Sequence, residues 1–591
     1  MFAAALAVFV LAIFGLEFYR GKKEEKNFIE KLYRGYLKLS DRKYPTERFE
    51  KMDSFYRRHP EEWQIDDITW NDLGMDELFK RMNYTLSATG EEYLYYRLRT
   101  LRRDREELEH FEQKVRFFGE HPDERVRFQF RMNKLGHTGK YSLYDYIDNL
   151  DYLGERSNRK HICMDLLFLP LAALCTVNFS LGLIGIVALM IYNIISYFKE
   201  KGEIDPYIIS FAYVIRLLDI CDELEKTGLS GCEEELEQIR FHKKRMQAMR
   251  RNSFWVMNSG SARGGNASGD IIGVLLDYIR MVFHVDLMKF NNMLSVLREH
   301  VEDVDGLIAA VGYLETAVAV WIFRESLTNG WCCPEFTGES AGGADRESAI
   351  REGKNREEKI REGKASSGSG REGKLELENG YHPLLDHPVK NSITAERGVL
   401  LTGSNASGKS TFLKTVALNA ILAQTIHTCA ADGYRGCFYR IFSSMALRDD
   451  LAGGESYYIV EIKALKRILD AAASGGGRIL CFVDEVLRGT NTVERIAASN
   501  QILKSLGGSG IVCFAATHDI ELTELLREDF DNYHFEEDVR DGDISFNYRL
   551  QTGKATGRNA IRLLELLGYD GGITDRASRQ AERFLITGSW K

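Results

Sequence analysis

The 591-residue chain has few prolines, no patterned cysteines and no excess of positive charge. With only 8 prolines, its long stretches rich in Leu, Glu, Lys and Arg favour helix over much of the chain. Its 10 cysteines form no CxxC pair and no regular spacing, which argues against a zinc site or a disulfide framework and favours a reducing compartment. The 78 basic and 87 acidic residues give a net charge of −9, so composition alone does not indicate nucleic-acid binding.

The first apolar segment, residues 1–19, predicts a membrane anchor. Its apolar run is followed at once by Arg20, Lys22 and Lys23. A signal peptide would carry its positive charges before the apolar run, so this order favours a retained anchor whose charged flank faces the cytoplasm.

The second apolar segment, residues 162–198, predicts a transmembrane hairpin. As one helix it would measure about 55 Å, far more than a hydrocarbon core of about 30 Å. Asn178, Ser180 and Gly182 lie at its centre, where a turn fits, and both flanks are basic, so both ends should face the cytoplasm. A pair of buried core helices is the alternative. The sequence therefore predicts a multi-pass cell-membrane protein with most of its chain in the cytoplasm.

The remaining chain divides by composition. Residues 24–160 and 203–334 show the apolar spacing of helices, and residues 337–374 have the Gly-, Ser- and charge-rich composition of a disordered linker. Residues 375–591 alternate strand-like apolar runs with helical patterns, which is typical of a parallel α/β sheet. The expected fold class is multidomain α and α/β, with membrane helices, a helical region and a C-terminal α/β domain.

The most specific chemical motif lies where a short apolar strand, residues 398–402, runs into the pattern GxxxxGK[ST] and then into a helical run. The glycines of this pattern let backbone N–H groups wrap around phosphates, and the start of the helix adds its positive dipole. Lys409 is expected to reach the β- and γ-phosphates of ATP, and Ser410 to bind Mg²⁺. The residues expected to contact the nucleotide here are Gly403, Ser404, Asn405, Ala406, Ser407, Gly408, Lys409, Ser410 and Thr411.

Two further strands end in residues that fit the chemistry of such a site. The strand at residues 478–484 ends in Asp484, which we expect to hold the magnesium, and Glu485, which we expect to activate the attacking water. The strand at 510–516 leads to His518, at the edge of the sheet where ligands bind, and predicts a contact with the γ-phosphate or the water. Ordinary surface acids and a structural histidine are the alternatives.

These motifs resemble the ATPase domain of the MutS family of DNA mismatch-repair proteins. The resemblance rests on GSNASGKST (403–411), DDLAGGESYYIVE (449–461), VDEVLRGTNT (483–492), FAATH (514–518), LQTGKATGRNAIRLLELLGY (550–569), DRASRQAERFL (575–585) and HPLL (382–385). It implies an α/β ATPase domain of ABC/MutS type that uses ATP and Mg²⁺, forms a homodimer and acts on DNA.

The same resemblance implies roles for individual residues. Ser456 would act across the dimer interface, and residues 489–492 would signal between the two sites. Tyr548 would flank the adenine ring, where an aromatic side chain can stack. Residues 76–94 resemble the start of the family's helical core, so the helices that follow would form the core and lever arms.

The chain also departs from the family, since no counterpart of its mismatch-reading domain is found and membrane segments are foreign to ordinary repair proteins. We therefore expect a membrane-anchored ATPase that binds branched or damaged DNA rather than mismatches. An ABC-type transport ATPase is an alternative because LAGGES resembles a transporter signature, although Lys409 and Asp484 are only 75 residues apart, which leaves little room for a transporter's helical subdomain. A membrane-associated scaffold with a non-DNA partner is the third interpretation, although it would not need Lys409, Ser410, Asp484 or Glu485.

Overall fold

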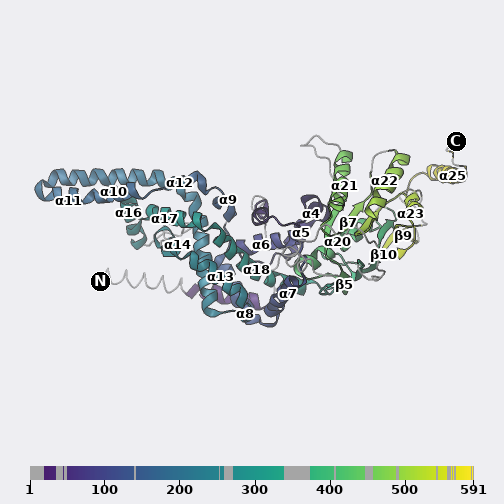
Figure 1. Ribbon diagram of the computed structural model, residues 1–591, viewed down its shortest axis with the longest axis horizontal. Coiled ribbons are helices and arrows are strands. Elements are labelled where there is room, and N and C mark those ends of the chain that lie inside the picture. The colour runs from purple at the N-terminus through teal and green to yellow at the C-terminus, as the bar shows by residue number, and fades with distance from the viewer. Residues whose placement is uncertain are drawn as a thin grey trace, which may run out of the picture. The chain divides into compact units, whose positions relative to one another are not determined.

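The computed structural model describes residues 19–34 except 21, 49–138, 142–257 except 252, 271–337, 373–404, 407–445, 457–487, 491–540, 543–555 and 568–587, with positions 44, 561, 564 and 589. The chain divides into two units, each described here by itself. The first comprises Met1–Pro60, Asn83–Tyr96 and Gln113–Ile322, and the second comprises Glu61–Met82, Arg97–Glu112 and Phe323–Lys591. Helices predominate, and two mixed sheets lie in the second unit (Figure 1).

The described part of the first unit is helical. Its elements are α3 (Ser54–Arg58), α8 (Pro122–Leu135), α9 (Leu143–Ile147), η2 (Leu150–Leu153), α10 (Arg159–Leu166), α11 (Phe168–Val177), α12 (Phe179–Thr227), α13 (Glu233–Arg245), α14 (Gln247–Arg251), α15 (Ser253–Met257), α16 (Ile271–Phe283) and α17 (Val285–Glu299). Three helices have residues in both units: α6 (Ala88–Arg99), α7 (Arg105–Glu120) and α18 (Val301–Ser326).

The helices α11 and α12 form a hairpin that turns at Asn178. The Asn178 side chain accepts a hydrogen bond from the Leu181 backbone N–H at 3.1 Å and so caps the start of α12. The two helices approach closely where α12 carries glycines: a Cβ atom at Gly182 would lie 2.5 Å from the Cys175 sulfur, and one at Gly185 would lie 2.7 Å from a methyl group of Leu171. Small residues at a helix–helix contact allow this approach.

The second arm of the hairpin is longer than the apolar run that predicts it. Residue 198 ends the apolar run, but α12 continues without a break to Thr227, through Pro206, and spans 49 residues. Many of the side chains beyond residue 203 are buried, among them Ile208, Phe211, Val214 and Leu218. The helix continues because this later part packs into the core of the first unit.

A second long apolar helix, α18, has a different environment. Among the described residues, three helical segments are by length and composition apolar enough to cross a membrane: Arg159–Val177, Phe179–Thr227 and Val301–Ser326. The most apolar windows of the first two are 6% and 11% buried, whereas that of Val301–Ser326 is 78% buried. We conclude that α18 is a core helix.

The second unit contains an α/β sheet of six strands in the order β10-β9-β4-β8-β7-β6. All neighbours are parallel except β9 and β10 at one edge. The strands are β4 (Gly398–Thr402), β6 (Tyr439–Ser444), β7 (Arg478–Asp484), β8 (Ile511–Ala516), β9 (Phe530–Arg540) and β10 (Asp543–Thr552). The parallel α/β arrangement expected for residues 375–591 is thus present, with one antiparallel edge strand. Parallel strands buried on both faces read as continuous apolar runs, and β4 and β7 do so.

A smaller sheet and several helices complete the second unit. The sheet has the order β1-β5-β2-β3, with β1 (Glu335–Phe336), β2 (Leu375–Gly380), β3 (Asn391–Ala395) and β5 (Gly433–Gly436). The helices are α4 (Asp67–Leu73), α5 (Met75–Met82), α20 (Lys409–Ile426), α21 (Tyr457–Ala473), α22 (Thr492–Leu506), α23 (Glu521–Leu525) and α25 (Gly571–Thr587). One core cluster joins Leu465 of α21, Leu503 of α22 and the strand residues Leu400, Cys481 and Cys513.

Candidate nucleotide site

The loop between β4 and α20 has the backbone that a phosphate-binding turn requires. Gly403 and Gly408 adopt φ angles of 143° and 107°, which are accessible to glycine and strained for other residues. A Cβ atom at Gly403 would lie 2.9 Å from the carbonyl oxygen of Phe535. Because α20 begins directly after Gly408, its first N–H groups have no partner within the helix and are available to an anion.

Lys409 points back into this loop. Its ammonium donates hydrogen bonds to the carbonyl oxygens of Gly403 and Ser404, both at 2.7 Å, and its side chain is buried. The loop carbonyls therefore hold the positive charge beside the helix start, where phosphate oxygens would replace them as partners.

Ser410 and Asp484 meet across the sheet edge. The Ser410 hydroxyl donates to Oδ2 of Asp484 at 2.5 Å, although the two residues are 74 positions apart. They come together because α20 follows β4 while Asp484 ends β7, two strands away, and the carboxyl ends of parallel strands lie at one edge. A hydroxyl and a carboxylate oxygen are ligands that Mg²⁺ prefers, so these two residues fit the metal expected there.

Glu485 and His518 form the second pair at this edge. The Nε2 atom of His518 lies 2.6 Å from a carboxylate oxygen of Glu485. Glu485 itself has a φ angle of 56°, and its backbone N–H donates to the carbonyl oxygen of Ala516 at 2.9 Å. The end of β8 therefore fixes the backbone and the side chain of Glu485 together.

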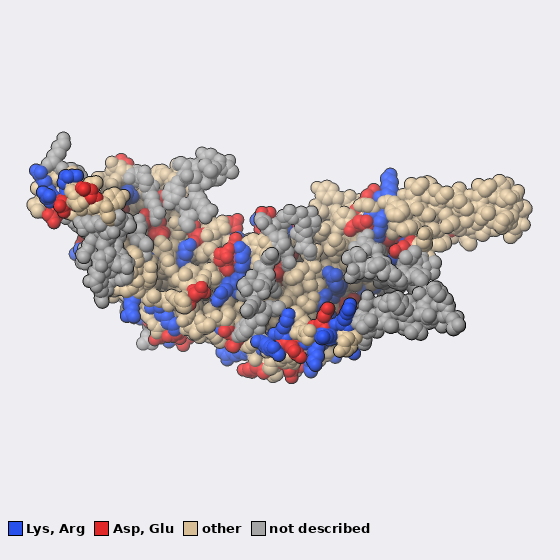
Figure 2. Space-filling model, turned by 180° about the vertical axis from the view of Figure 1, so that it is seen from behind, with Lys and Arg blue, Asp and Glu red and all other residues tan. Residues whose placement is uncertain are grey.

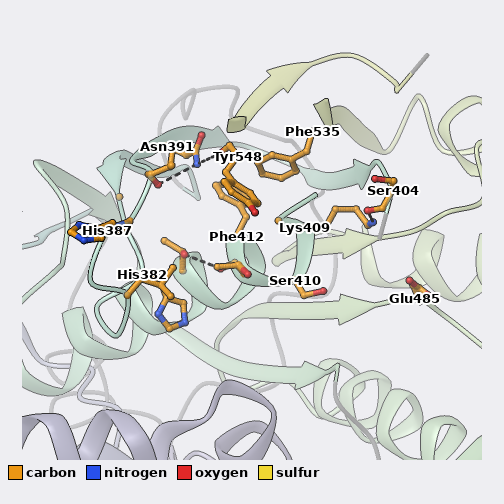
Figure 3. Close-up of a pocket in the computed structure, with 17 residues that line it drawn as sticks. His382, His387, Asn391, Ser404, Lys409, Ser410, Phe412, Glu485, Phe535 and Tyr548 are labelled. Atoms are coloured by element: carbon orange, nitrogen blue, oxygen red, sulfur yellow. Dashed lines mark hydrogen bonds between the residues drawn. The ribbon is translucent and has the colours of Figure 1, made fainter. Parts of the chain in front are cut away.

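A cavity of about 460 Å³ adjoins this loop, large enough for a nucleotide-sized ligand (Figure 3). Ser404, Lys409, Ser410 and Glu485 lie toward one end, His382 and His387 toward the other, and Tyr548 between them, beside Gly408. The full lining is Gly380, His382, Leu385, His387, Pro388, Val389, Asn391, Ser404, Gly408, Lys409, Ser410, Thr411, Phe412, Thr415, Glu485, Phe535 and Tyr548.

The end of the cavity remote from Glu485 contains a neutral histidine, His382. Burial, assisted by the positive charge of Lys414, lowers the pKa of His382 to about 4, so its imidazole is neutral at physiological pH. Its Nδ1 atom accepts a hydrogen bond from the Leu384 backbone N–H at 3.3 Å, which leaves the proton on Nε2. Tyr548 lies on the opposite wall, stacked on Phe546 with ring centroids 5.9 Å apart.

The structure brings most of the sequence-predicted residues to one place. The described residues Gly403, Ser404, Ser407, Gly408, Lys409, Ser410, Thr411, Asp484, Glu485, His518 and Tyr548 line the cavity or contact residues that do. Asn405, Ala406, Ser456 and residues 488–490 lie outside the described residues. Sequence reasoning missed Asn391, His387 and Phe535 as cavity residues. His382 had a signal, since it begins the HPLL segment that resembles the family's entry segment.

One other group of side chains has the spacing of metal ligands. Glu112, Cys333 and His427 have ligand atoms within 4.8 Å of one another, the one such group found among the described residues. The Glu112 carboxylate, however, is bound by both terminal nitrogens of Arg324, at 3.0 and 2.5 Å. A guanidinium already neutralises this carboxylate, so we interpret the group as a buried ion pair.

Comparison with known proteins finds similarity over the α/β region. The family model described as MutS domain V matches residues 399–585. The DNA mismatch repair protein MutS of Natronomonas pharaonis is 32% identical over 212 residues, which cover 34% of this chain and 24% of the relative. The MutS proteins of Thermus thermophilus and Thermotoga maritima are 31% identical over 208 residues and 33% over 234, covering 34% and 36% of this chain and 25% and 29% of the relatives. The chain thus spans less than a third of the length of these relatives.

Proposed function

We propose that the whole chain is a membrane-anchored, magnesium-dependent ATPase that couples ATP binding to DNA binding. The proposal rests on the match of residues 399–585 to the family model described as MutS domain V. The observation that carries the ATPase is the arrangement at one sheet edge of a lysine inside a glycine loop, a serine–aspartate pair and a glutamate–histidine pair.

Each residue then has a distinct role. The loop N–H groups and Lys409 bind the β- and γ-phosphates, and Ser410 and Asp484 hold Mg²⁺, which neutralises charge on the transferred phosphate. Glu485 accepts the proton of the attacking water, and His518 orients the Glu485 carboxylate. Tyr548, which lies beside Gly408 and lines the same cavity, contacts the base.

The proposed active form is a homodimer. Ser456 of one protomer would complete the site of its partner, so that ATP binding closes two sites across a two-fold axis and hydrolysis reopens them. DNA is the proposed partner because the named relatives are DNA mismatch repair proteins. We propose branched or damaged DNA as the preferred form; the similarity to the family model covers residues 399–585.

The hairpin of α11 and α12 supports membrane anchoring. Its large apolar side chains point outward, including Leu169, Phe179, Leu181, Ile184 and Ile195, all more than half exposed. Figure 2 shows the outer length of the hairpin without Lys, Arg, Asp or Glu on the face in view. A helix that is apolar on all sides requires a lipid or protein environment. The segment Arg159–Val177, which comprises α10 and α11, and the segment Phe179–Thr227 are each long enough for a bilayer span.

The base of the hairpin is polar, as a cytoplasmic membrane boundary requires. Lys160 pairs with Glu200 at 2.6 Å, and Arg156 pairs with Glu203 at 2.6 Å. Charged pairs therefore begin where the apolar length ends on both arms. Residues 1–18, the proposed first anchor, lie outside the described residues. We propose the cell membrane as the location, with the ATPase domain in the cytoplasm.

The test measures ATPase rate and DNA binding by the detergent-solubilised full chain. Turnover is recorded without DNA, with duplex DNA and with four-way-junction DNA, at two salt concentrations. We expect stimulation by DNA, greater for the junction, and binding that weakens as salt rises because phosphate contacts release counterions. Turnover that is unchanged by either DNA, together with no salt-dependent binding, would contradict the DNA part of the proposal and favour a scaffold with another partner.

A further inference from the structure

A buried carboxylate on α21 contacts the segment that follows β7 but does not line the nucleotide cavity. Glu461 belongs to α21 and is 3% exposed. One of its carboxylate oxygens accepts a hydrogen bond from the Leu487 backbone N–H at 2.5 Å, from a residue 26 positions later. This contact joins α21 to the segment that follows β7, two residues beyond Glu485.

The segment from Glu485 to Leu487 has a backbone that needs support. Glu485 and Leu487 have φ angles of 56° and 58°, in the left-handed region that side-chain-bearing residues rarely adopt. Such a conformation persists only where the surroundings hold it, and it is concentrated at functional sites. Here it turns the chain sharply at the residue proposed to activate water.

Three contacts hold this turn. The Glu485 N–H donates to the Ala516 carbonyl oxygen at 2.9 Å, and the Ser499 hydroxyl donates to the Val486 carbonyl oxygen at 3.3 Å. The third contact is the Glu461–Leu487 bond, and of the three it alone comes from α21. The hydrogen bonds at the beginning and middle of the turn come from β8 and α22. The end of the turn is bonded to α21, so a displacement of α21 would displace Leu487.

The start of α21 is the part of this unit nearest in sequence to the proposed dimer contact. The helix begins at Tyr457, directly after Ser456, and Glu461 follows Ser456 by five residues. A helix is stiff over such a distance, so a shift of its first turn moves the Glu461 carboxylate with it.

We propose that Glu461 is a positioning residue that sets the direction of the Glu485 carboxylate. Through it, the position of α21 bears on the direction of the Glu485 side chain, the proposed water-activating group. This inference rests on the proposed ATPase function and deepens it. Glu461 touches neither water nor phosphate; it acts through the Leu487 N–H and the turn, and hydrolysis is fast only when that bond is formed.

The experiment compares three substitutions in the detergent-solubilised full chain. Glu461→Gln keeps an acceptor oxygen at the same reach, Glu461→Asp keeps the charge but withdraws the oxygen by one methylene, and Glu461→Ala removes the acceptor. Misplacement of a catalytic group by about 1 Å costs on the order of 100-fold in rate. We therefore expect kcat to fall by about 100-fold in the Ala and Asp variants and by less than about threefold in Gln, with the Mg·ATP dissociation constant unchanged.

The matched control is Asp470→Ala, also on α21, whose side chain is exposed and pairs with Lys466. It should leave kcat and binding unchanged. A second readout separates positioning from general stability: with Glu485→Gln already present, Glu461→Asp should slow turnover no further, because both changes remove the same function.

The outcomes are distinguishable. Glu461→Asp with the turnover of the unchanged protein, or Glu461→Gln as slow as Glu461→Asp, would overturn the inference and leave the ATPase standing. Failure of the unchanged protein to bind Mg·ATP would refute the proposed function itself. If Glu461→Ala does not fold, the contrast between the Asp and Gln variants still decides.

Discussion

The side-chain amide of Asn391 makes two hydrogen bonds to the backbone around Tyr548. Its Nδ2 atom donates to the Tyr548 carbonyl oxygen at 3.0 Å (Figure 3). Its Oδ1 atom accepts from the Leu550 N–H at 2.8 Å. The β9–β10 pairing shifts register between Phe546 and Leu550, and Tyr548 has a φ angle of 54° within that irregularity. The Asn391 side chain thus makes hydrogen bonds that a neighbouring strand would otherwise make at this irregularity. These bonds hold Tyr548 over Gly408, where a Cβ atom would lie 3.1 Å from the tyrosine ring.

Removal of the Asn391 amide should weaken nucleotide binding. Each lost hydrogen bond is worth about 1 kcal/mol, and a tenfold change in affinity is about 1.4 kcal/mol. Asn391→Ala loses both bonds and should therefore raise the Mg·ATP dissociation constant by about 30-fold, and Asn391→Asp, which keeps the acceptor for Leu550, by less. Isothermal titration calorimetry measures both. Equal affinities in the two variants and the unchanged protein would show that Tyr548 does not contact the base.

Substitution of Glu485 should separate binding from hydrolysis. Glu485→Gln keeps the size of the side chain but removes the proton acceptor, so the protein should retain Mg·ATP while turnover falls by at least about 100-fold. His518→Ala should slow turnover by a smaller factor, because it removes only the group that orients Glu485. Single-turnover measurements with radiolabelled ATP test both. Normal turnover of Glu485→Gln would reject Glu485 as the base.

Acid should destabilise the second unit partly through His382. Its pKa in the folded protein is about 4 because the ring is buried, whereas an unfolded histidine titrates near its ordinary value of 6.5. As pH falls from 6.5 toward 4, the unfolded chain gains a proton that the folded chain does not, and folding stability falls. The contribution of His382 to the free energy of unfolding is therefore fully present above pH 6.5 and is lost as the pH falls toward 4.

Replacement of His382 by Gln should therefore flatten the pH dependence of stability. Between pH 7.5 and pH 5 the unchanged protein should lose up to about 2 kcal/mol more than His382→Gln, by the relation of 1.36 kcal/mol per pKa unit. Urea unfolding at the two pH values measures this difference. The control variant is His387→Gln, at an exposed position of the same segment. Identical curves for His382→Gln and the unchanged protein would refute the burial of a neutral imidazole.

Charges placed on the hairpin should release it from the membrane. Val187 and Ile191 are exposed on α12 one turn apart, and an arginine near the bilayer centre costs about 3 kcal/mol. In a chain from which the other proposed anchor, residues 1–19, has been removed, the double variant Val187→Arg/Ile191→Arg should move from the carbonate-washed membrane fraction toward the supernatant, and the same truncation without these substitutions should stay in the pellet. The control Tyr152→Arg changes an exposed residue of η2 outside the hairpin and should remain in the pellet. Recovery of the unchanged chain in the supernatant would contradict membrane anchoring.

The sequence predicts the phosphate end of the site well because the chemistry there is local. A strand, a glycine loop and a helix are consecutive from Gly398 to Ile426, so the pattern alone specifies the place of Lys409 and Ser410. Asp484 and His518 follow apolar runs, and parallel strands bring their ends to one edge. The meeting of Ser410 with Asp484 follows from these two rules without further information.

Other features depend on contacts that no local pattern records. The hydrogen bond from Asn391 to the Tyr548 carbonyl oxygen joins residues 157 positions apart and requires an irregularity in the β9–β10 strand pair. The continuation of α12 past residue 198 depends on the side chains against which its later part packs. Composition also fails to separate α18 from the hairpin, because all three segments are apolar enough for a span and burial alone distinguishes them.

The central claim is that the loop after Gly403, with Lys409 and the acids of β7, binds a polyphosphate and its magnesium. Equilibrium binding of radiolabelled ATP to the purified, detergent-solubilised protein, with and without Mg²⁺, tests it most directly. We predict saturable binding that requires Mg²⁺ and is abolished in Lys409→Ala, while the unfolding midpoint of that variant in the absence of nucleotide stays close to that of the unchanged protein. No retention of Mg·ATP by the unchanged protein, or equal retention by Lys409→Ala, would contradict the account.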